Sequence, residues 1–177
     1  MNKHATLYQG RYLSLLEVDG WEYASRSNAS GVVVLVAVTP DNELVLVEQF
    51  RIPVNGRVIE LPAGLVGDLG DRDEPLLLAA QRELLEETGF EAGRLDILMS
   101  CPSSAGMSDE TVTFVRASGL TRRTAGGGDP SEEITVHLVP LAEVDQWIER
   151  RRTAGKPFDP KIFSALYWLG RPDANPG

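Results

Sequence analysis

An uninterrupted run of aliphatic side chains, GVVVLVAV at residues 31–38, most constrains the fold of this 177-residue chain. A strand with one face in water alternates apolar and polar residues, whereas this run contains no polar side chain. The run therefore predicts a strand that is buried on both faces. Such a strand requires further layers of structure above and below its sheet, and a chain of this length is sufficient to build them within one domain.

Strand and helix signals on either side of the run indicate what these layers are. A glycine- and aspartate-rich loop is predicted at residues 63–73. Further strands are predicted at residues 43–48, 57–61, 94–100, 111–117 and 133–139. Helices are predicted at residues 75–88, 141–151 and 160–169. Because strands and helices are interleaved irregularly, we expect an α/β (α+β) fold with a mixed sheet sandwiched between helices, an α/β/α arrangement.

The N-terminal segment has the pattern of a separate unit. Residues 6–26 are predicted to form an antiparallel strand pair joined at Asp19-Gly20, a dipeptide typical of hairpin turns. We therefore divide the chain into an N-terminal β-hairpin at residues 1–29 and a main domain at residues 30–177.

The composition of the chain argues against some classes of binding partner. The formal net charge is −9, whereas a nucleic-acid-binding surface needs a basic patch. No apolar run approaches the ~18 residues that a membrane span requires. The single cysteine, Cys101, excludes an internal disulfide, and the N-terminus lacks the pattern of a signal peptide. We expect a cytoplasmic protein that binds a small molecule and neither nucleic acid nor a membrane.

The predicted helix at residues 75–88 carries a dense group of acidic side chains. Glu83, Glu86 and Glu87 stand at positions i, i+3 and i+4, so they share one helix face. Three neighbouring carboxylates repel one another unless water or a cation separates them. The face is therefore either solvated or a site for a hard cation such as Mg²⁺, which prefers oxygen ligands.

The register of the surrounding residues favours the cation site. Glu74 lies eight residues before Arg82, and Gly89-Phe90 close the helix. This pattern resembles the Nudix box, G-x5-E-x7-R-E-U-x-E-E-x-G-U, where U is aliphatic or aromatic, and every specified position from Glu74 to Phe90 matches. One position departs, because nine residues rather than five separate Gly64 from Glu74. We interpret this as an enlarged loop with about four extra residues, since loops tolerate insertions.

The resemblance implies the Nudix fold and a role for each residue of the motif. Glu83 and Glu87 are implied to be the main metal ligands, with Glu86 a further ligand or a catalytic base. Arg82 is implied to orient these carboxylates in catalysis, a task that suits its rigid fork of donors. The carbonyl of Ala63 is implied to add a metal ligand. The implied cofactor is Mg²⁺, with Mn²⁺ as a possible replacement.

Other segments resemble one branch of the family, the ADP-ribose and nucleoside-diphosphate-sugar pyrophosphatases. Residues 47–51, VEQFR, are similar to the branch's E-Q-[YF]-R segment, and residues 60–64 match its E-L-P-A-G. Residues 100–110 look like a longer form of its S-P-G-x-S-[DNE]-E loop, which lines the substrate. By this resemblance the predicted substrate-binding residues are Arg51, Leu65, Ser108, Asp109, Glu110 and Trp21.

Several residues can be the catalytic base. Branch members use a glutamate on a loop before a late strand, and the matching region here is residues 128–134, GDPSEEI. Alignment with that strand places Glu132 on a metal-binding glutamate and places Pro130, which cannot act as a base, on the position used in some relatives. The glycine run at residues 126–128 is expected to let this loop close over substrate. The remaining candidates for the base are Asp129, Glu132, Glu133 and Glu86.

The activity implied by the resemblance is divalent-metal-dependent hydrolysis of the pyrophosphate bond of ADP-ribose or a related nucleoside diphosphate sugar. The products are a nucleoside monophosphate and a sugar phosphate. A UDP- or GDP-sugar or a dinucleotide is an alternative substrate, and a non-catalytic nucleotide-binding sensor is a second alternative. N-terminal strands in the branch contribute to a dimer and to the base pocket. This implies a homodimer here, with Trp21 able to stack on a nucleobase.

Overall fold

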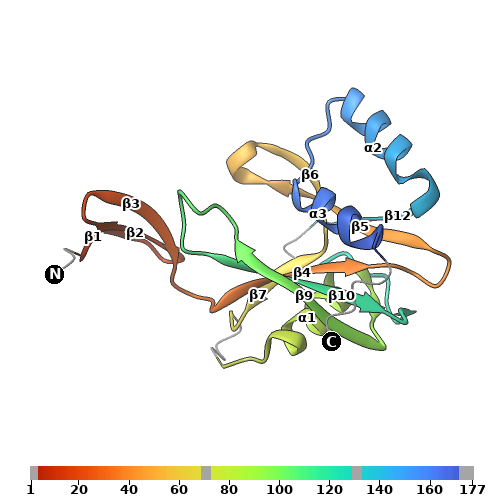
Figure 1. The fold of residues 1–177 in the computed structure, drawn as a ribbon, viewed down its shortest axis with the longest axis horizontal. Coiled ribbons are helices and arrows are strands. Elements are labelled where there is room, and N and C mark those ends of the chain that lie inside the picture. Colours follow the sequence, from red (N-terminus) through yellow and green to blue (C-terminus); the bar gives the residue numbers. More distant parts are fainter. Residues whose placement is uncertain (1–3, 69–72, 129–132, 172–177) are drawn as a thin grey trace.

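The computed structural model describes residues 4–68, 73–128 and 133–171 (Figure 1). Within these ranges the main domain has a mixed central sheet in the order β7-β4-β10-β9, in which β4 and β10 are parallel and the other pairs antiparallel. Its strands are β4 (Gly31–Ala37), β7 (Ala63–Val66), β9 (Arg94–Pro102) and β10 (Thr111–Ser118). A second, antiparallel sheet contains β5 (Glu43–Arg51), β6 (Gly56–Glu60) and β12 (Thr135–Pro140).

Three helices and several short elements complete the described main domain. The helices are α1 (Leu76–Thr88), α2 (Val144–Thr153) and α3 (Lys161–Leu169). Short 3₁₀ turns are η1 (Ile52–Val54) and η2 (Leu141–Glu143), and a two-stranded ribbon is formed by β8 (Phe90–Glu91) and β11 (Thr121–Arg122). No helix of the described residues is long and apolar enough to cross a membrane.

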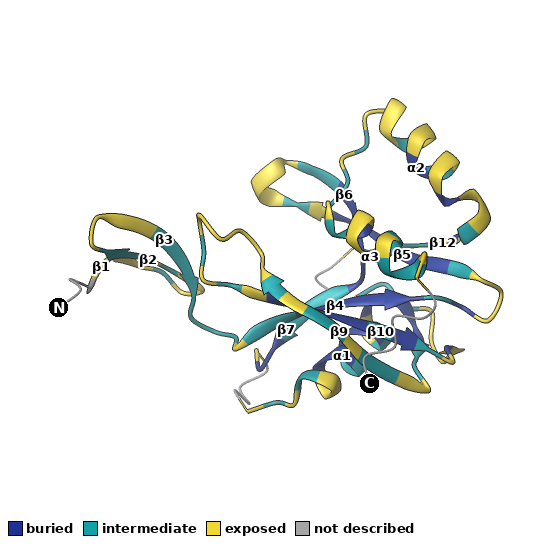
Figure 2. Ribbon diagram, in the orientation of Figure 1, coloured by how far each residue is buried: buried dark blue, intermediate teal, exposed yellow. Residues whose placement is uncertain are grey.

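Strand β4 is buried on both faces, as the sequence predicts. Val33 and Leu35 face a core that they share with Leu84 of α1. Val34 and Val36 face the opposite core, which includes residues of α2 and α3. Figure 2 shows the consequence, because β4 and β10 are dark blue through the centre of the domain while the outer surface of α2 is exposed. The predicted arrangement of a sheet between helices is confirmed.

The N-terminal segment forms three strands, where the sequence pattern predicts two. They are β1 (His4–Gln9), β2 (Leu13–Val18) and β3 (Trp21–Arg26), in that order within one antiparallel sheet. The Asp19-Gly20 turn is confirmed, and both residues have positive φ. The additional turn lies at Gly10, whose N–H donates to the carbonyl of Leu13 at 2.8 Å. This sheet stands apart from the main domain (Figure 1).

The predicted loop at residues 63–73 is wrong in its first part. Residues 63–66 form β7, which pairs antiparallel with β4. Glycine content hides this strand in the sequence, whereas its backbone supplies the edge of the central sheet. The pairing matters for the site because it lies beside α1.

Candidate functional site

The helix α1 separates its three glutamates into two environments. It ends at Gly89, whose φ of 77° is left-handed and whose N–H donates to the carbonyl of Leu85 at 2.9 Å. Glu83 and Glu87 face the sheet and are buried, whereas the side chain of Glu86 is 52% exposed. The sequence predicts one shared acidic face. In the structure this face consists of two buried carboxylates and a third carboxylate that is exposed to solvent.

The carboxylate of Glu83 lies directly against the backbone of Gly64. A Cβ added at Gly64 would lie 1.8 Å from the carboxyl carbon of Glu83, so no larger residue fits beside this side chain. Burial raises the pKa of Glu83 to about 7, and the neighbouring Arg82 offsets only part of that effect. Gly64, the glycine at the irregular spacing, thus makes the space for a buried acid.

Glu87 is held by the backbone of β7. Its Oε2 accepts a hydrogen bond from the N–H of Ala63 at 3.0 Å. Ala63 pairs with Val34 of β4, so the sheet fixes the position of this carboxylate. The sequence prediction brings Ala63 to the site through its carbonyl, and the structure places the residue beside Glu87 through its amide. One carboxylate oxygen of Glu87 is thereby oriented.

Arg82 joins the loop before the helix to the carboxylates on it. Its Nε and Nη2 donate to the two oxygens of Glu74 at 3.1 and 3.2 Å, and its Nη1 donates to Glu83 at 2.7 Å. Burial opposes its charge, but the hydrogen bonds and charges of Glu74 and Glu83 raise the pKa of Arg82 overall. Nη2 also donates to the carbonyl of Leu65 at 3.0 Å and to Asp68 at 3.4 Å. Leu65 is predicted to bind substrate. In the structure its carbonyl accepts this hydrogen bond from Arg82.

Arg51 lies near the buried carboxylates. Its Nε and Nη2 donate to the two oxygens of Glu60, each at 2.7 Å, and this bidentate pair raises the pKa of Arg51. The charge of Glu87 also raises the pKa of Arg51, so Glu87 lies within electrostatic range of this guanidinium. Sequence reasoning missed Glu60 as the residue that orients Arg51. The pairing of β6 with β5 brings the two residues together, because residue 60 lies opposite residue 47 on the strand that ends at Arg51.

The loop of the predicted base is described only at its two ends. Asp129, Pro130 and Glu132 lie outside the described residues, whereas Glu133 is described and its side chain is 92% exposed. The preceding glycines bind the end of α1, because Gly127 and Gly128 donate to the carbonyls of Glu87 and Glu86 at 2.9 and 3.0 Å. In this structure the glycine run is therefore an attachment to α1.

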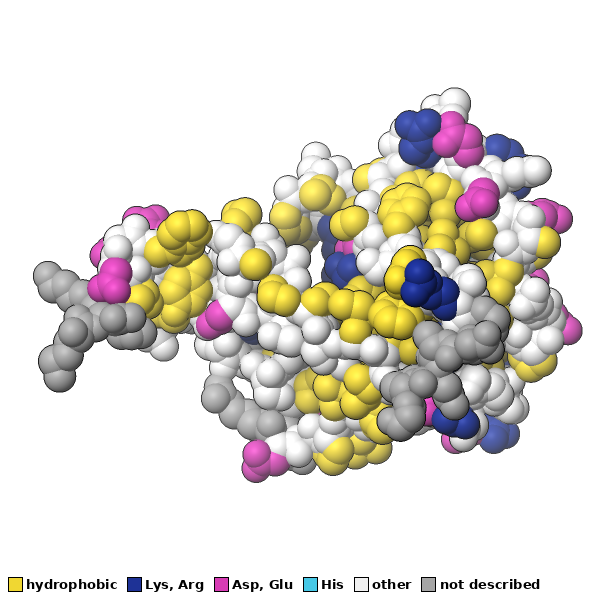
Figure 3. Space-filling model, in the orientation of Figure 1, with side chains coloured by type: hydrophobic (Ala, Val, Ile, Leu, Met, Phe, Trp, Pro, Cys, Tyr) yellow, Lys and Arg dark blue, Asp and Glu magenta, His cyan; other side chains and the backbone are white. Residues whose placement is uncertain are grey.

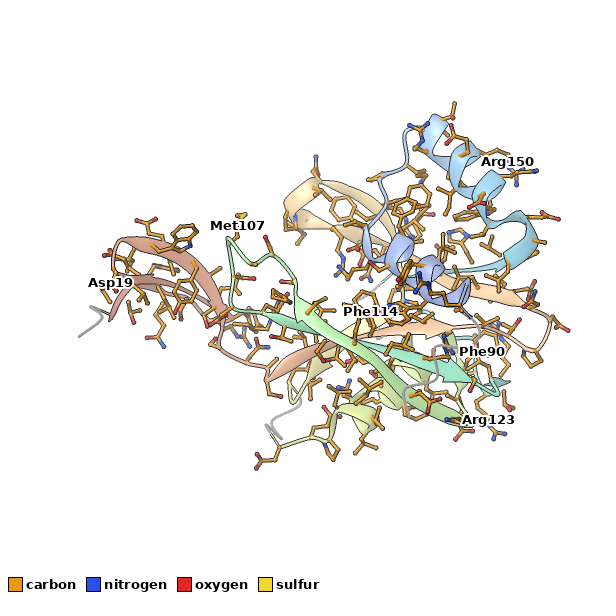
Figure 4. The ribbon with its side chains drawn as sticks, viewed as in Figure 1. Asp19, Phe90, Met107, Phe114, Arg123 and Arg150 are labelled. Carbon is orange, nitrogen blue, oxygen red and sulfur yellow. The ribbon has the colours of Figure 1, made fainter. Side chains whose placement is uncertain are left out.

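The remaining predicted substrate residues gather at the N-terminal sheet. The loop at residues 103–110 runs beside β3, where Asp109 accepts a hydrogen bond from Ser25 at 2.8 Å and Glu110 pairs with Arg26 at 2.9 Å. Ser108 lies in the same loop, 3.2 Å from the hydroxyl of Ser103. Figure 4 shows Met107 at the tip of this loop, and it is an exposed residue.

A small cavity separates this loop from the central sheet. It has a volume of about 190 Å³ and is lined in part by Arg26, Asp109 and Glu110. Trp21 lies at the far end of the N-terminal sheet beside the Asp19-Gly20 turn and is 63% exposed. Within one chain the structure therefore does not bring Trp21 to α1 (Figure 1).

The donor set suits a cation that keeps part of its water shell. Among residues 4–68, 73–128 and 133–171, no three His, Cys, Asp or Glu side chains are gathered into a cage that would hold a metal ion alone. Mg²⁺ in proteins is commonly held by one or two carboxylates, with waters and substrate phosphates as the other ligands. Glu83 and Glu87, buried and oriented by Gly64 and Ala63, match that requirement.

Comparisons with known proteins agree with this geometry. Residues 29–165 match the family model described as NUDIX domain. A solved structure described as that of an ADP compounds hydrolase superposes with a TM-score of 0.73 over 98% of this chain and 95% of that one, at 22% sequence identity. This likeness shows a shared fold.

Three curated relatives have 31–35% sequence identity to the chain. A methanol dehydrogenase activator of Bacillus methanolicus is 31% identical over 94% of this chain and 90% of its own length. An ADP-ribose pyrophosphatase of Mycobacterium tuberculosis is 35% identical over 68% of this chain and 57% of its own length. A GDP-mannose pyrophosphatase of Escherichia coli is 33% identical over 68% of this chain and 64% of its own length.

Proposed function

Because the chain belongs to the Nudix hydrolase family, we propose that it hydrolyses the pyrophosphate bond of ADP-ribose or a related nucleoside diphosphate sugar in the presence of a divalent metal. The resemblance of the 74–90 motif to the Nudix box is confirmed by the family match. The finer proposal draws on relatives named for ADP-ribose and GDP-mannose pyrophosphatase activity. The single cysteine and the acidic composition favour a cytoplasmic setting.

The observation that carries the proposal is the pair of buried carboxylates, Glu83 and Glu87. A buried acid costs free energy unless a cation or hydrogen bonds compensate it. Arg82 compensates Glu83 only partly, since the pKa of Glu83 stays raised at about 7. We propose that Glu83 and Glu87 hold the metal, Mg²⁺ or Mn²⁺, with Glu86 and Glu132 as further ligands and the carbonyl of Ala63 as an additional oxygen.

The other residues have separate tasks in this proposal. When bound, the metal would neutralise charge on the pyrophosphate oxygens and polarise them as a Lewis acid, which would make the phosphorus more electrophilic. Arg51 binds the diphosphate through Nη1, because Glu60 already engages Nε and Nη2. A carboxylate of Glu86, Glu132 or Glu133 accepts the proton of the attacking water. Arg82 keeps Glu83 oriented through its 2.7 Å hydrogen bond.

There are two further candidates for the function. A GDP-sugar is the alternative substrate, since one relative is named a GDP-mannose pyrophosphatase. Binding of a nucleotide without cleavage is the second alternative. Retention of Glu83, Glu86, Glu87 and Arg82 favours hydrolysis.

We expect the protein to release phosphate from one member of a panel of ADP-ribose, UDP-glucose, GDP-mannose and NADH. Product formation would be coupled to a phosphatase, with Mg²⁺ and then Mn²⁺. Glu87→Gln should lower turnover by roughly 10²-fold or more, as expected when an electrostatic contact of the transition state is lost. Arg94→Gln, which alters an exposed pair with Asp96, is the control. Binding of a panel member without cleavage, measured by calorimetry, would support the sensor instead.

We also propose that residues 1–29 form the dimer interface. The described N-terminal sheet exposes large apolar side chains, which Figure 3 shows as hydrophobic surface on the projecting unit. They are Leu7, Tyr8, Tyr12, Leu13, Leu15 and Trp21. An apolar patch of this kind on a soluble chain is typical of an interaction surface.

The dimer is tested by light scattering at micromolar concentration. The wild-type mass should be twice the 19.3 kDa of one chain. The double variant Leu13→Asp, Trp21→Ser should have the mass of one chain, because a buried aspartate is costly in an apolar interface. Tyr167→Ser, which alters an exposed aromatic on α3, should remain dimeric. A wild-type protein with the mass of one chain contradicts the proposal.

A further inference from the structure

The residues on either side of positions 129–132 are held by two sets of contacts. At the first end, Gly127 donates to the carbonyl of Glu87 at 2.9 Å, and its own carbonyl accepts the N–H of Ile134 at 3.3 Å. Gly126 packs so closely that an added Cβ would lie 2.4 Å from the carbonyl carbon of Thr88. The loop thus leaves and returns at one point, beside the C-terminus of α1.

At the second end, Arg57 of β6 holds the returning strand. Its Nη2 donates to the carbonyl of Glu133 at 3.2 Å and to the hydroxyl of Thr135 at 3.0 Å. Its Nη1 lies 3.4 Å from the carboxylate of Glu133. One guanidinium therefore contacts the backbone and the side chain of Glu133 together, which its planar fork allows and an ammonium group does not.

Arg57 is itself fixed by a buried acid, Glu48 of β5. Nη2 of Arg57 donates to the carbonyl of Glu48 at 2.8 Å, and Nε lies 3.5 Å from its carboxylate. That carboxylate also accepts Lys156 at 2.6 Å and His137 at 3.0 Å. Burial opposes the charge of Glu48, but its hydrogen bonds with Lys156 and His137 lower the pKa overall. Glu48 therefore stays ionised and holds the side chain of Arg57 in a fixed position.

These contacts suit orientation of the loop better than stability. Glu133 is 92% exposed, and a pair between an arginine and an exposed carboxylate contributes little to folding. Lys156 and His137 provide Glu48 with close polar partners without Arg57. Among the described partners of Glu48, Arg57 also contacts Glu133 and Thr135, at the end of the segment that carries the acidic candidates for the base.

We infer that Arg57 is a positioning residue for hydrolysis, which fixes Glu133 and the end of its loop relative to the carboxylates of α1. The inference rests on the proposed function, because it assigns the proton-accepting carboxylate to this loop. Arg57 touches neither the buried pair on α1 nor Arg51 in the described contacts, so it acts through Glu133. Loss of Arg57 should slow the chemical step and leave substrate binding nearly intact.

The test compares steady-state kinetics of Arg57→Gln and Arg57→Lys with those of the wild type. Arg57→Gln should lower kcat roughly 10-fold to 100-fold, the scale of a misplaced catalytic group, and should change KM less than about threefold. Arg57→Lys should keep the low kcat, because lysine restores the charge but not the fork. A kcat restored by lysine, or an unchanged kcat in Arg57→Gln, overturns the inference.

Lys156→Gln is the matched control. It removes another cationic partner of Glu48 without touching Glu133 or Thr135. It should lower thermal stability and leave kcat near that of the wild type. An equal loss of kcat in Lys156→Gln would show that Arg57 acts through the stability of Glu48, and would overturn the positioning role. If Arg57→Gln does not fold, Thr135→Val removes one acceptor of Arg57 with little change of shape, and a smaller fall in kcat is expected.

Hydrogen–deuterium exchange supplies a readout that needs no turnover. In Arg57→Gln without substrate, the peptide that covers residues 126–138 should exchange faster, while peptides of α1 should remain protected. Exchange equal to that of the wild type would show that Arg57 does not hold this segment in place. The wild type could cleave no member of the nucleotide panel while exchange still rises in the variant. The proposed function would then be wrong, but Arg57 would still hold this segment in place.

Discussion

Glu83→Gln is expected to slow hydrolysis strongly and at the same time to stabilise the metal-free protein at neutral and alkaline pH. The folded-state pKa of Glu83 is raised to about 7 from an ordinary value of 4.5, chiefly by burial. Between these two values the folded protein keeps a proton that the unfolded chain has released, so stability falls as pH rises through this window. Above pH 7 the cost is on the order of 3 kcal/mol. Glutamine carries no charge and avoids it.

Differential scanning fluorimetry with a chelator, at pH 5 and at pH 8, measures this effect. At pH 8 the melting temperature of Glu83→Gln should exceed that of the wild type by roughly 5 °C, whereas the difference should be small at pH 5. Added Mg²⁺ should raise the melting temperature of the wild type more than that of the variant, because a ligand stabilises the state that binds it. A variant that is less stable than the wild type at pH 8 without metal would show that the ionised Glu83 side chain does not destabilise the folded protein.

Loss of activity in the same variant has a different cause. The proposed metal is held by Glu83 and Glu87, and glutamine offers a neutral oxygen in place of a carboxylate. Turnover should fall roughly 10²-fold to 10³-fold, the range for loss of one electrostatic contact in the transition state. Stability and activity would then change in opposite directions, as expected where a site stores an unfavourable charge for use in catalysis. Retained turnover would remove Glu83 from the proposed ligand set.

Arg82→Met is expected to cause the largest loss of stability among these variants. Arg82 is 17% exposed, and it donates to Glu74 and Glu83, whose side chains are 10% and 12% exposed. The hydrogen bond from Arg82 is the main cause of the lowered pKa of Glu74. Methionine has a similar length but leaves both carboxylates without this cation. Removal of one partner from a buried ion pair costs about 3–5 kcal/mol.

Urea denaturation followed by circular dichroism at pH 8 measures the change directly. Arg82→Lys should show a smaller loss, because one ammonium group keeps a charge but cannot reach Glu74, Glu83 and Leu65 together. Arg94→Met is the control for an exposed arginine, and its change should be within about 0.5 kcal/mol. If Arg82→Met behaved like Arg94→Met, the carboxylates near Arg82 would have to be compensated by water instead.

The sequence predicted the features that depend on local pattern. The apolar run at residues 31–38 predicted a strand with two buried faces, and that is how β4 lies. The spacing of Glu74, Arg82 and Gly89 predicted the helix, which is confirmed, and in the structure Arg82 donates to Glu74 at 3.1 Å. Helix periodicity and motif register carry such information, because every residue involved lies within a few turns of the others.

Contacts between distant segments could not be predicted in the same way. Glu48 meets Lys156 although the two residues are 108 positions apart, and Glu133 meets Arg57 across 76 positions. Neither pair has a periodic pattern, because strand pairing and the α2–α3 connection bring them together. The first N-terminal strand was missed for a related reason, since a single glycine at residue 10 marks its turn. The roles assigned to Trp21, Ser108, Asp109 and Glu110 remain predictions that depend on the second copy of the chain.

The parallel pairing of β4 with β10 has a consequence for how the protein is made. Val32 lies opposite Val112, so the centre of the sheet joins residues 80 positions apart, with α1 between them. Pairings of this sequence separation form late, because closing the long intervening loop costs conformational entropy before the new contacts can offset it. Leu84 of α1 shares its core with Val115 and Ala117 of β10. On the ribosome, the apolar core beneath α1 therefore stays incomplete until β10 has emerged, although β4 and β7, which also pack against α1, are already present.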